Sequence, residues 1–122
     1  MKGLLIIGAL NGALAVILGA FGAHGLKSRV DTAMLDVWST ASEYHFYHAL
    51  ALILVGILAK QFGDSGVVSA GWVMFAGMGI FSGSLYALVL SGTRWLGAIT
   101  PLGGTALIIG WAMLAWALYK SA

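Results

Sequence analysis

The chain has 122 residues, of which 61% are hydrophobic and only 8% are charged, and it contains no cysteine. Its mean hydropathy of +0.98, with 18 glycines and one proline, excludes an ordinary soluble domain and is typical of a membrane protein with several spans. Six Lys and Arg residues without a basic cluster exclude a nucleic-acid-binding surface, and disulfide or thiol chemistry is impossible without cysteine.

The first apolar stretch predicts a membrane span over residues 3–23, because about 20 helical residues cross a hydrocarbon core of about 30 Å. Lys2 precedes this stretch and small residues follow it at Gly22 and Ala23, which is the pattern of a secretory signal peptide. The apolar run is longer than the usual 7–15 residues of a signal peptide. We therefore expect a span that is not cleaved.

A short amphipathic segment follows. Asp31 is the expected N-cap of a helix that starts at Thr32. Met34 and Trp38 then share one helical stripe, and Asp36 and Glu43 lie outside it. The pattern predicts a short interfacial helix over residues 32–43, before the second span.

Three further spans are predicted over residues 44–60, 67–90 and 95–119. Gly63 and Gly66 mark the turn between the second and third spans, and Pro101 falls in the first turns of the fourth. The short connections favour antiparallel packing of sequential helices. The expected fold is all-α and integral to the membrane, with four antiparallel transmembrane helices in one domain that covers residues 1–122.

Small residues line one face of the first span and one face of the third. In a bilayer such faces let helix backbones approach closely. We expect helix packing, and an oligomer, through Gly8, Gly12, Gly19, Gly79 and Gly83. The expected partners are the lipid bilayer and a second copy or another membrane protein, and not a nucleic acid.

The charges leave the orientation undecided. With four spans, one membrane face carries three basic residues and the other face carries three, so the positive-inside rule gives a tie. The two sets are Lys2, Lys60 and Lys120 on one face, and Lys27, Arg29 and Arg94 on the other.

Polar side chains concentrate toward the face with Lys27, Arg29 and Arg94, which we call the loop-one side. Buried imidazoles need hydrogen-bond partners, and for His48 the candidates are Tyr86, Glu43 or a carbonyl near His24. The predicted polar cluster consists of His24, Tyr44, His48, Ser82, Ser84, Tyr86 and Thr100.

Three functions are compatible with this cluster. The first is a non-enzymatic scaffold or interaction protein whose polar residues tie the helices together. The second is a pocket for a metal, a haem or another small ligand, with His24, His45 and His48 as weak metal candidates. The third is a small oligomeric transporter or channel, although no span holds a deep carboxylate. No catalytic motif is present, so we expect no enzyme activity and no cofactor is implied.

Four ordered motifs resemble the domain-of-unknown-function 423 family, which includes bacterial inner-membrane proteins and the eukaryotic transmembrane protein 256. The motifs are GAFGAHGL at 19–26, WSTA at 38–41 with HALAL at 48–52, FSGSLY at 81–86 and ITPLGG at 99–104 with Gly110-Trp111.

The resemblance covers nearly the whole chain and implies a four-span protein of the bacterial cytoplasmic membrane. It also implies signature positions at His24, Tyr44, His48, Ser82, Ser84, Tyr86, Thr100 and Pro101. Members often carry Gln at the position of His45, which favours His24 and His48 as the histidine pair. The family implies no activity and no cofactor.

Overall fold

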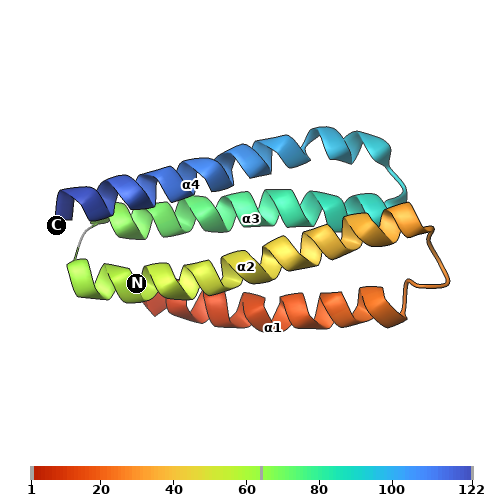
Figure 1. Cartoon of the computed structure of the whole chain (residues 1–122), viewed down its shortest axis with the longest axis horizontal. Coiled ribbons are helices and arrows are strands. Elements are labelled where there is room, and N and C mark those ends of the chain that lie inside the picture. The colour runs from red at the N-terminus through yellow and green to blue at the C-terminus, as the bar shows by residue number, and fades with distance from the viewer. Residues whose placement is uncertain (1, 64, 122) are drawn as a thin grey trace.

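The computed structural model describes residues 2–63 and 65–121, which form four long helices and one short 3₁₀ helix. The elements are α1 (Lys2–His24), α2 (Thr32–Phe62), α3 (Ser65–Ser91), η1 (Arg94–Ala98) and α4 (Thr100–Ser121). Figure 1 shows the long helices side by side, and the chain reverses its direction at each connection.

The helices pack in chain order rather than as a closed bundle. α1 packs on α2, α2 on α3 and α3 on α4, whereas α1 touches α3 and α2 touches α4 only marginally. Within residues 2–63 and 65–121, α1 and α4 do not meet. The row of helices in Figure 1 agrees with this order. One consequence is that α1 and α3 each keep a long face that no other helix covers.

Four helical segments are long and apolar enough to cross a membrane: Lys2–His24, Thr32–Phe62, Ser65–Ser91 and Arg94–Ser121. α2 has 31 residues and is therefore about 46 Å long, which exceeds a hydrocarbon core of about 30 Å. Part of α2 must accordingly extend into the headgroup region.

The expected interfacial helix over residues 32–43 is not a separate element, because α2 runs without a break from Thr32 to Phe62. The physical reason is local. The junction at Glu43 and Tyr44 contains neither Pro nor Gly, so nothing interrupts the backbone hydrogen bonds once the helix has started. The amphipathic residues form the first turns of the second span.

Residues with special backbone roles mark both ends of α2. Asp31 caps the first turn as predicted, since its carboxylate accepts a hydrogen bond of 2.9 Å from the Met34 N–H. Gly63 closes the helix in the left-handed region at φ 64°, and its N–H donates to the Ala59 carbonyl. That conformation is strained for any residue with a side chain.

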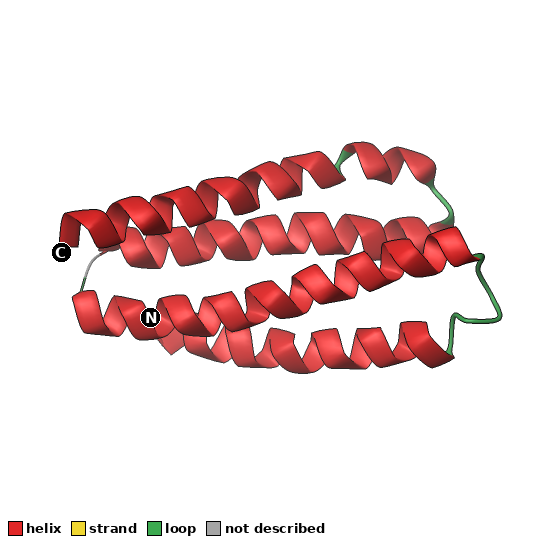
Figure 2. Ribbon diagram, viewed as in Figure 1, coloured by secondary structure: helices red, strands yellow, loops and turns green. Residues whose placement is uncertain are grey.

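The fourth span consists of two pieces. Pro101 has no N–H, and its ring clashes with the carbonyl four residues earlier in a continuous helix. The 3₁₀ helix η1 therefore ends at Ala98, and α4 begins at Thr100 with Pro101 in its first turn. The short loop between the two pieces is visible in Figure 2.

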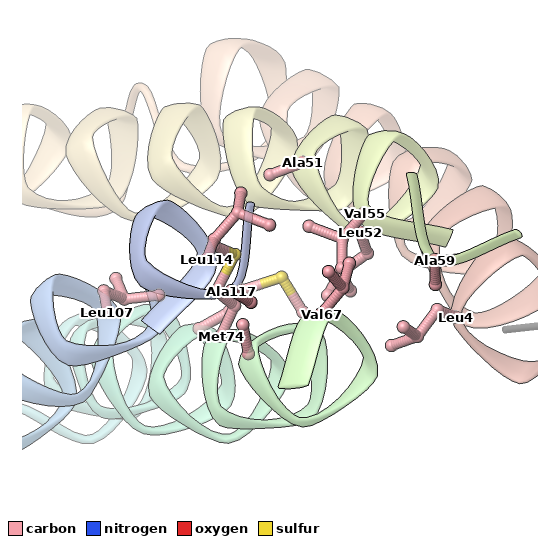
Figure 3. Packing of buried hydrophobic residues seen from close by; sticks show 12 residues of the cluster. Leu4, Ala51, Leu52, Val55, Ala59, Val67, Met74, Leu107, Leu114 and Ala117 are labelled. Carbon is pink, nitrogen blue, oxygen red and sulfur yellow. The ribbon is translucent and has the colours of Figure 1, made fainter. Parts of the chain in front are cut away.

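The apolar core draws side chains from all four long helices, as Figure 3 shows. Leu4 of α1, Leu52 of α2 and Met74 of α3 are fully buried, and Leu114 of α4 is 5% exposed. A second cluster surrounds the buried Trp38 at the loop-one side. The two clusters hold the helices in fixed register, so the polar side chains between them are well positioned.

Candidate functional site

His45 on α2 lies at the centre of a polar network that joins three helices. The side chain is 5% exposed. Its Nδ1 lies 2.9 Å from the Tyr86 hydroxyl of α3, and its Nε2 lies 2.9 Å from Asn11 Oδ1 of α1. α1, α2 and α3 are thus linked through one imidazole ring.

The bonding of Asn11, at one end of this network, determines which group donates in each hydrogen bond. The Asn11 amide nitrogen donates to the Ile7 carbonyl at 2.9 Å, so Asn11 Oδ1 faces the imidazole and can only accept. A neutral His45 then carries its proton on Nε2, and Nδ1 accepts from the Tyr86 hydroxyl. Both ring nitrogens are occupied.

His48, one helical turn further along α2, is also fully hydrogen-bonded. The Tyr44 carbonyl accepts from Nδ1 at 2.9 Å, and the Trp111 indole of α4 donates to Nε2 at 3.1 Å. The expected partners Tyr86 and Glu43 are therefore wrong for His48. Sequence spacing missed Trp111 because Trp111 comes from a helix that scarcely touches α2.

Two serines of α3 hold this helix to its neighbours. Ser82 donates to the Ala41 carbonyl of α2 at 2.8 Å, and the Ser84 and Thr100 hydroxyls lie 2.6 Å apart. Ser84 also lies 3.0 Å from the Phe81 carbonyl, whereas Thr100 lies 3.4 Å from the Leu96 carbonyl. The shorter distances favour Thr100 as the donor to Ser84, and Ser84 as the donor to Phe81.

Trp38 anchors α2 against the end of α1. Its indole N–H donates to the Leu18 carbonyl at 2.7 Å, and its ring centroid lies 4.7 Å from that of Tyr86. The ring lies directly over Gly22, so that a Cβ at Gly22 would collide with it. Trp38 thus depends on a residue without a side chain on the facing helix.

His24 stands apart from the other histidines. It is exposed at the end of α1 and shares no hydrogen bond with His45 or His48, whose ring nitrogens are bonded elsewhere. No group of three or more His, Cys, Asp or Glu side chains suited to a metal ion occurs in the part of the chain that the structure describes. His24, His45 and His48 therefore do not form a ligand set.

The rest of the predicted cluster lies at the helix contacts. Tyr44, His48, Ser82, Ser84, Tyr86 and Thr100 each contact a neighbouring helix or support a residue that does. Four further members were not in the predicted cluster: Asn11, Trp38, Trp111 and His45, the centre of the network, which the sequence offered only as a weak metal candidate. For Asn11 a signal existed, since it is the only strongly polar side chain in the middle of the first span.

Comparison with known proteins identifies the family of the chain. The family model described as "Protein of unknown function (DUF423)" matches residues 18–104. The chain belongs to this family. It is 54% identical over 121 residues to the UPF0382 membrane protein YwdK of Bacillus subtilis (strain 168), a match that covers 98% of each chain. No solved structure matches the chain.

Other DUF423 relatives include the UPF0382 membrane protein SAB0533 of Staphylococcus aureus (strain bovine RF122 / ET3-1), 49% identical over 100% of this chain and 99% of that protein. The UPF0382 membrane protein SSP2132 of Staphylococcus saprophyticus is 46% identical over 98% of this chain and 99% of that protein. With four candidate spans, this DUF423 protein is a multi-pass protein of the bacterial cytoplasmic membrane.

The predicted glycine faces of this DUF423 protein fall into two groups. A Cβ at Gly8 would lie 2.9 Å from the Ala49 carbonyl, and one at Gly19 would lie 3.7 Å from the Ser42 hydroxyl, so both face α2. At Gly12, Gly79 and Gly83 a Cβ would meet no atom of residues 2–63 and 65–121 within 4 Å. Only the first group packs against another helix of the same chain.

An apolar groove runs beside the second group. Its volume is about 270 Å³, and it lies between α1 and α3 with α2 beneath it. Gly79 and Gly83 form part of one wall, and Asn11, His45 and Tyr86 also line it. The groove opens on the faces of α1 and α3 that no other helix covers.

Proposed function

We propose that this DUF423 protein is a non-enzymatic membrane scaffold that associates with a second copy of itself. The observation that carries the proposal is the complete internal hydrogen bonding of the polar cluster. No buried side-chain nitrogen or oxygen lacks a partner among the described residues. A side chain that is already bonded on both sides must give up a partner before it can bind a ligand or exchange a proton.

The surface for association is the uncovered face of α3. Gly79 and Gly83 form a G-x-x-x-G pair, and no atom of the residues that the structure describes would contact a Cβ at either position. In a bilayer, helices associate by close packing of such small residues rather than by the hydrophobic effect. Two copies related by a two-fold axis along the membrane normal would bring identical faces together.

The proposal is tested by changing both glycines to leucine in one variant. Leucine fits the monomer, because both sites are free of neighbours, but it holds two α3 helices apart. We expect the dimer dissociation constant to rise by at least about tenfold, equivalent to roughly 1.4 kcal/mol. Single-molecule photobleaching of labelled protein in liposomes measures this constant.

Gly12→Leu is the matched control, since Gly12 is equally free of neighbours but lies on α1. We expect this variant to keep the dimer. A dimer that persists unchanged after both α3 substitutions, or a wild-type protein that is monomeric at all densities, would refute self-association through α3.

A second candidate is the binding of a small, mostly apolar ligand in the groove between α1 and α3. It is favoured by the position of Tyr86 and His45, which give an otherwise apolar groove one polar spot. A ligand of this kind would co-purify with the monomer. It would be displaced by leucine at Gly79 and Gly83, so mass spectrometry of the same variant separates the two candidates.

A further inference from the structure

A second cavity of this protein differs from the groove between α1 and α3 because charged side chains line it. It has a volume of about 350 Å³ and lies between the end of α1 and the first turns of α2. Lys27 lines it from the connection and Asp36 from α2, with the hydroxyls of Ser39 and Ser42 beside them. The buried Trp38 forms part of the wall.

The two charges face one cavity without pairing. No ion pair links Lys27 or Asp36 to any residue in ranges 2–63 and 65–121, although both line the same space. Glu43 adds a second carboxylate close by, where it accepts a hydrogen bond from Ser39 at 3.3 Å. A ligand that carries both an anionic and a cationic group would complement this arrangement.

The cavity continues into an apolar groove. The groove has a volume of about 210 Å³ and shares Ser42 with the charged cavity. Glu43 also lines it, next to Ser42, and its carboxylate is bonded to Ser39 of the charged cavity. The rest of the lining consists of Ala15 and Val16 of α1 and of Phe46 and Tyr47 of α2. The cavity and the groove together form a path that begins with charges and ends with apolar side chains.

The position of this path in the membrane decides what fits it. α2 is longer than the hydrocarbon core, so its first turns, with Asp36 and Ser39, lie at headgroup level. The groove beside Val16 and Phe46 lies further along both spans and faces the acyl chains. A phospholipid has its polar and apolar parts in the same order and at the same depths.

We propose that the cavity binds the headgroup of an aminophospholipid, with one acyl chain in the adjoining groove. The Lys27 ammonium and the Ser42 hydroxyl bind the phosphate, and the Asp36 carboxylate accepts hydrogen bonds from the lipid ammonium. Headgroups without an ammonium leave Asp36 unpaired. A trimethylated ammonium has no N–H to donate, so it binds more weakly.

The test is native mass spectrometry of the protein in mild detergent with equal amounts of three phospholipids that share the same acyl chains. Phosphatidylethanolamine carries a primary ammonium, phosphatidylcholine a quaternary one and phosphatidylglycerol none. We expect the ethanolamine lipid to be retained preferentially. Asp36→Asn lowers this preference by about three- to fivefold, the effect of losing one exposed charge pair, and Lys27→Gln weakens all three lipids.

Arg29→Gln is the matched control, because Arg29 is an exposed cation of the same connection that lines neither cavity. We expect it to leave the lipid preference unchanged, with a melting temperature equal to that of the wild type for all variants. Equal retention of the three lipids, or an equal loss in Arg29→Gln, would overturn the proposal.

Soluble glycerophosphoethanolamine serves as a competitor that lacks acyl chains. We expect it to displace the lipid only at concentrations far above those of the lipid itself. Displacement at equal concentration would show that the cavity binds a free phosphate compound and that the groove contributes nothing, which would refute the lipid assignment.

Discussion

His45 joins three helices with two ring nitrogens, and its environment explains why. Asn11 can only accept and the Tyr86 hydroxyl can donate, so the neutral imidazole satisfies both. In the hydrocarbon core no water is present to form a hydrogen bond with a polar group that has lost its partner. Removal of one member therefore exposes the others to the full desolvation penalty rather than to the loss of one average hydrogen bond.

Tyr86→Phe tests this network with the smallest possible change. It removes the donor to His45 Nδ1 but keeps the ring that packs on Trp38 at 4.7 Å. We expect the free energy of unfolding to fall by about 1 kcal/mol. This value lies between the average contribution of a side-chain hydrogen bond in a membrane protein and the cost of leaving a buried acceptor without a donor. Equilibrium unfolding in detergent measures the loss.

Tyr47→Phe is the control, because the Tyr47 side chain is 55% exposed and its hydroxyl makes no hydrogen bond among the described residues. We expect no measurable change. Equal losses in both variants would mean that the hydroxyl at position 86 contributes nothing specific.

His48→Ala asks whether the second buried histidine holds a metal. Both of its nitrogens are bonded, to the Tyr44 carbonyl and to the Trp111 indole, and an N–H donor at Nε2 blocks the lone pair that a metal needs. We expect no stoichiometric Fe, Cu or Zn in either protein, and a lower melting temperature in the variant. Elemental analysis of the purified proteins provides the measurement. A near-stoichiometric metal that is lost in His48→Ala would contradict the scaffold proposal.

At the scale of helices, the contact between α3 and α4 depends on Gly103, which belongs to the ITPLGG motif at 99–104 but was not among the predicted packing glycines. A Cβ at Gly103 would lie 2.8 Å from Phe81 Cα and 2.9 Å from the Ile80 carbonyl carbon. These are backbone atoms, which cannot move aside as a flexible side chain can. The two helices therefore approach as closely as their backbones allow.

Gly103→Ala should accordingly force α3 and α4 apart. We expect a destabilisation of about 1–3 kcal/mol, as for other overpacked contacts. The neighbouring Gly104→Ala is an internal control, because its Cβ would lie 3.7 Å from the Phe81 ring, which is an ordinary contact. Thermal unfolding in detergent compares the two. If Gly103→Ala is as stable as Gly104→Ala, the close approach of the two helices is not required for stability.

Hydropathy alone was sufficient to predict the four helices, since a span must satisfy its own backbone hydrogen bonds and must be long and apolar. Asp31 as the N-cap was also predictable, because a cap is a local interaction. The continuity of α2 from Thr32 to Phe62 could not be predicted in this way. The amphipathic pattern over residues 32–43 indicates which side of the helix faces water, but it does not indicate where the helix ends.

The candidate site was predictable only in part as a set of polar residues, since the predicted cluster lacked His45 and Asn11 and included His24, and its pairings were not predictable. Ser84 and Thr100 meet as members of one cluster, whereas His48 pairs with Trp111 rather than with Tyr86. Helical spacing fixes which residues share a face of one helix. It gives no information on which face of a second helix lies opposite, and the glycine faces were ambiguous for the same reason.

For the molecule as a whole, the row of helices leaves α1 and α3 with open faces and α1 without contact to α4 within residues 2–63 and 65–121. A closed bundle would bury these faces and would leave only lipid contacts outside. The open row instead supplies the surface proposed for a second copy and, at the other side of α1, the path proposed for a phospholipid.

The bond between Trp111 and His48 also has a consequence for biosynthesis. Among the side-chain hydrogen bonds described above that join two helices, the others link neighbours in chain order. Only this one skips a helix, and its partners are 63 positions apart in the sequence. The first three helices can therefore assemble as they emerge from the insertion machinery. Until α4 is inserted, His48 Nε2 has no hydrogen-bond donor from Trp111. The last helix thus completes the hydrogen bonding of His48 by supplying the Trp111 donor.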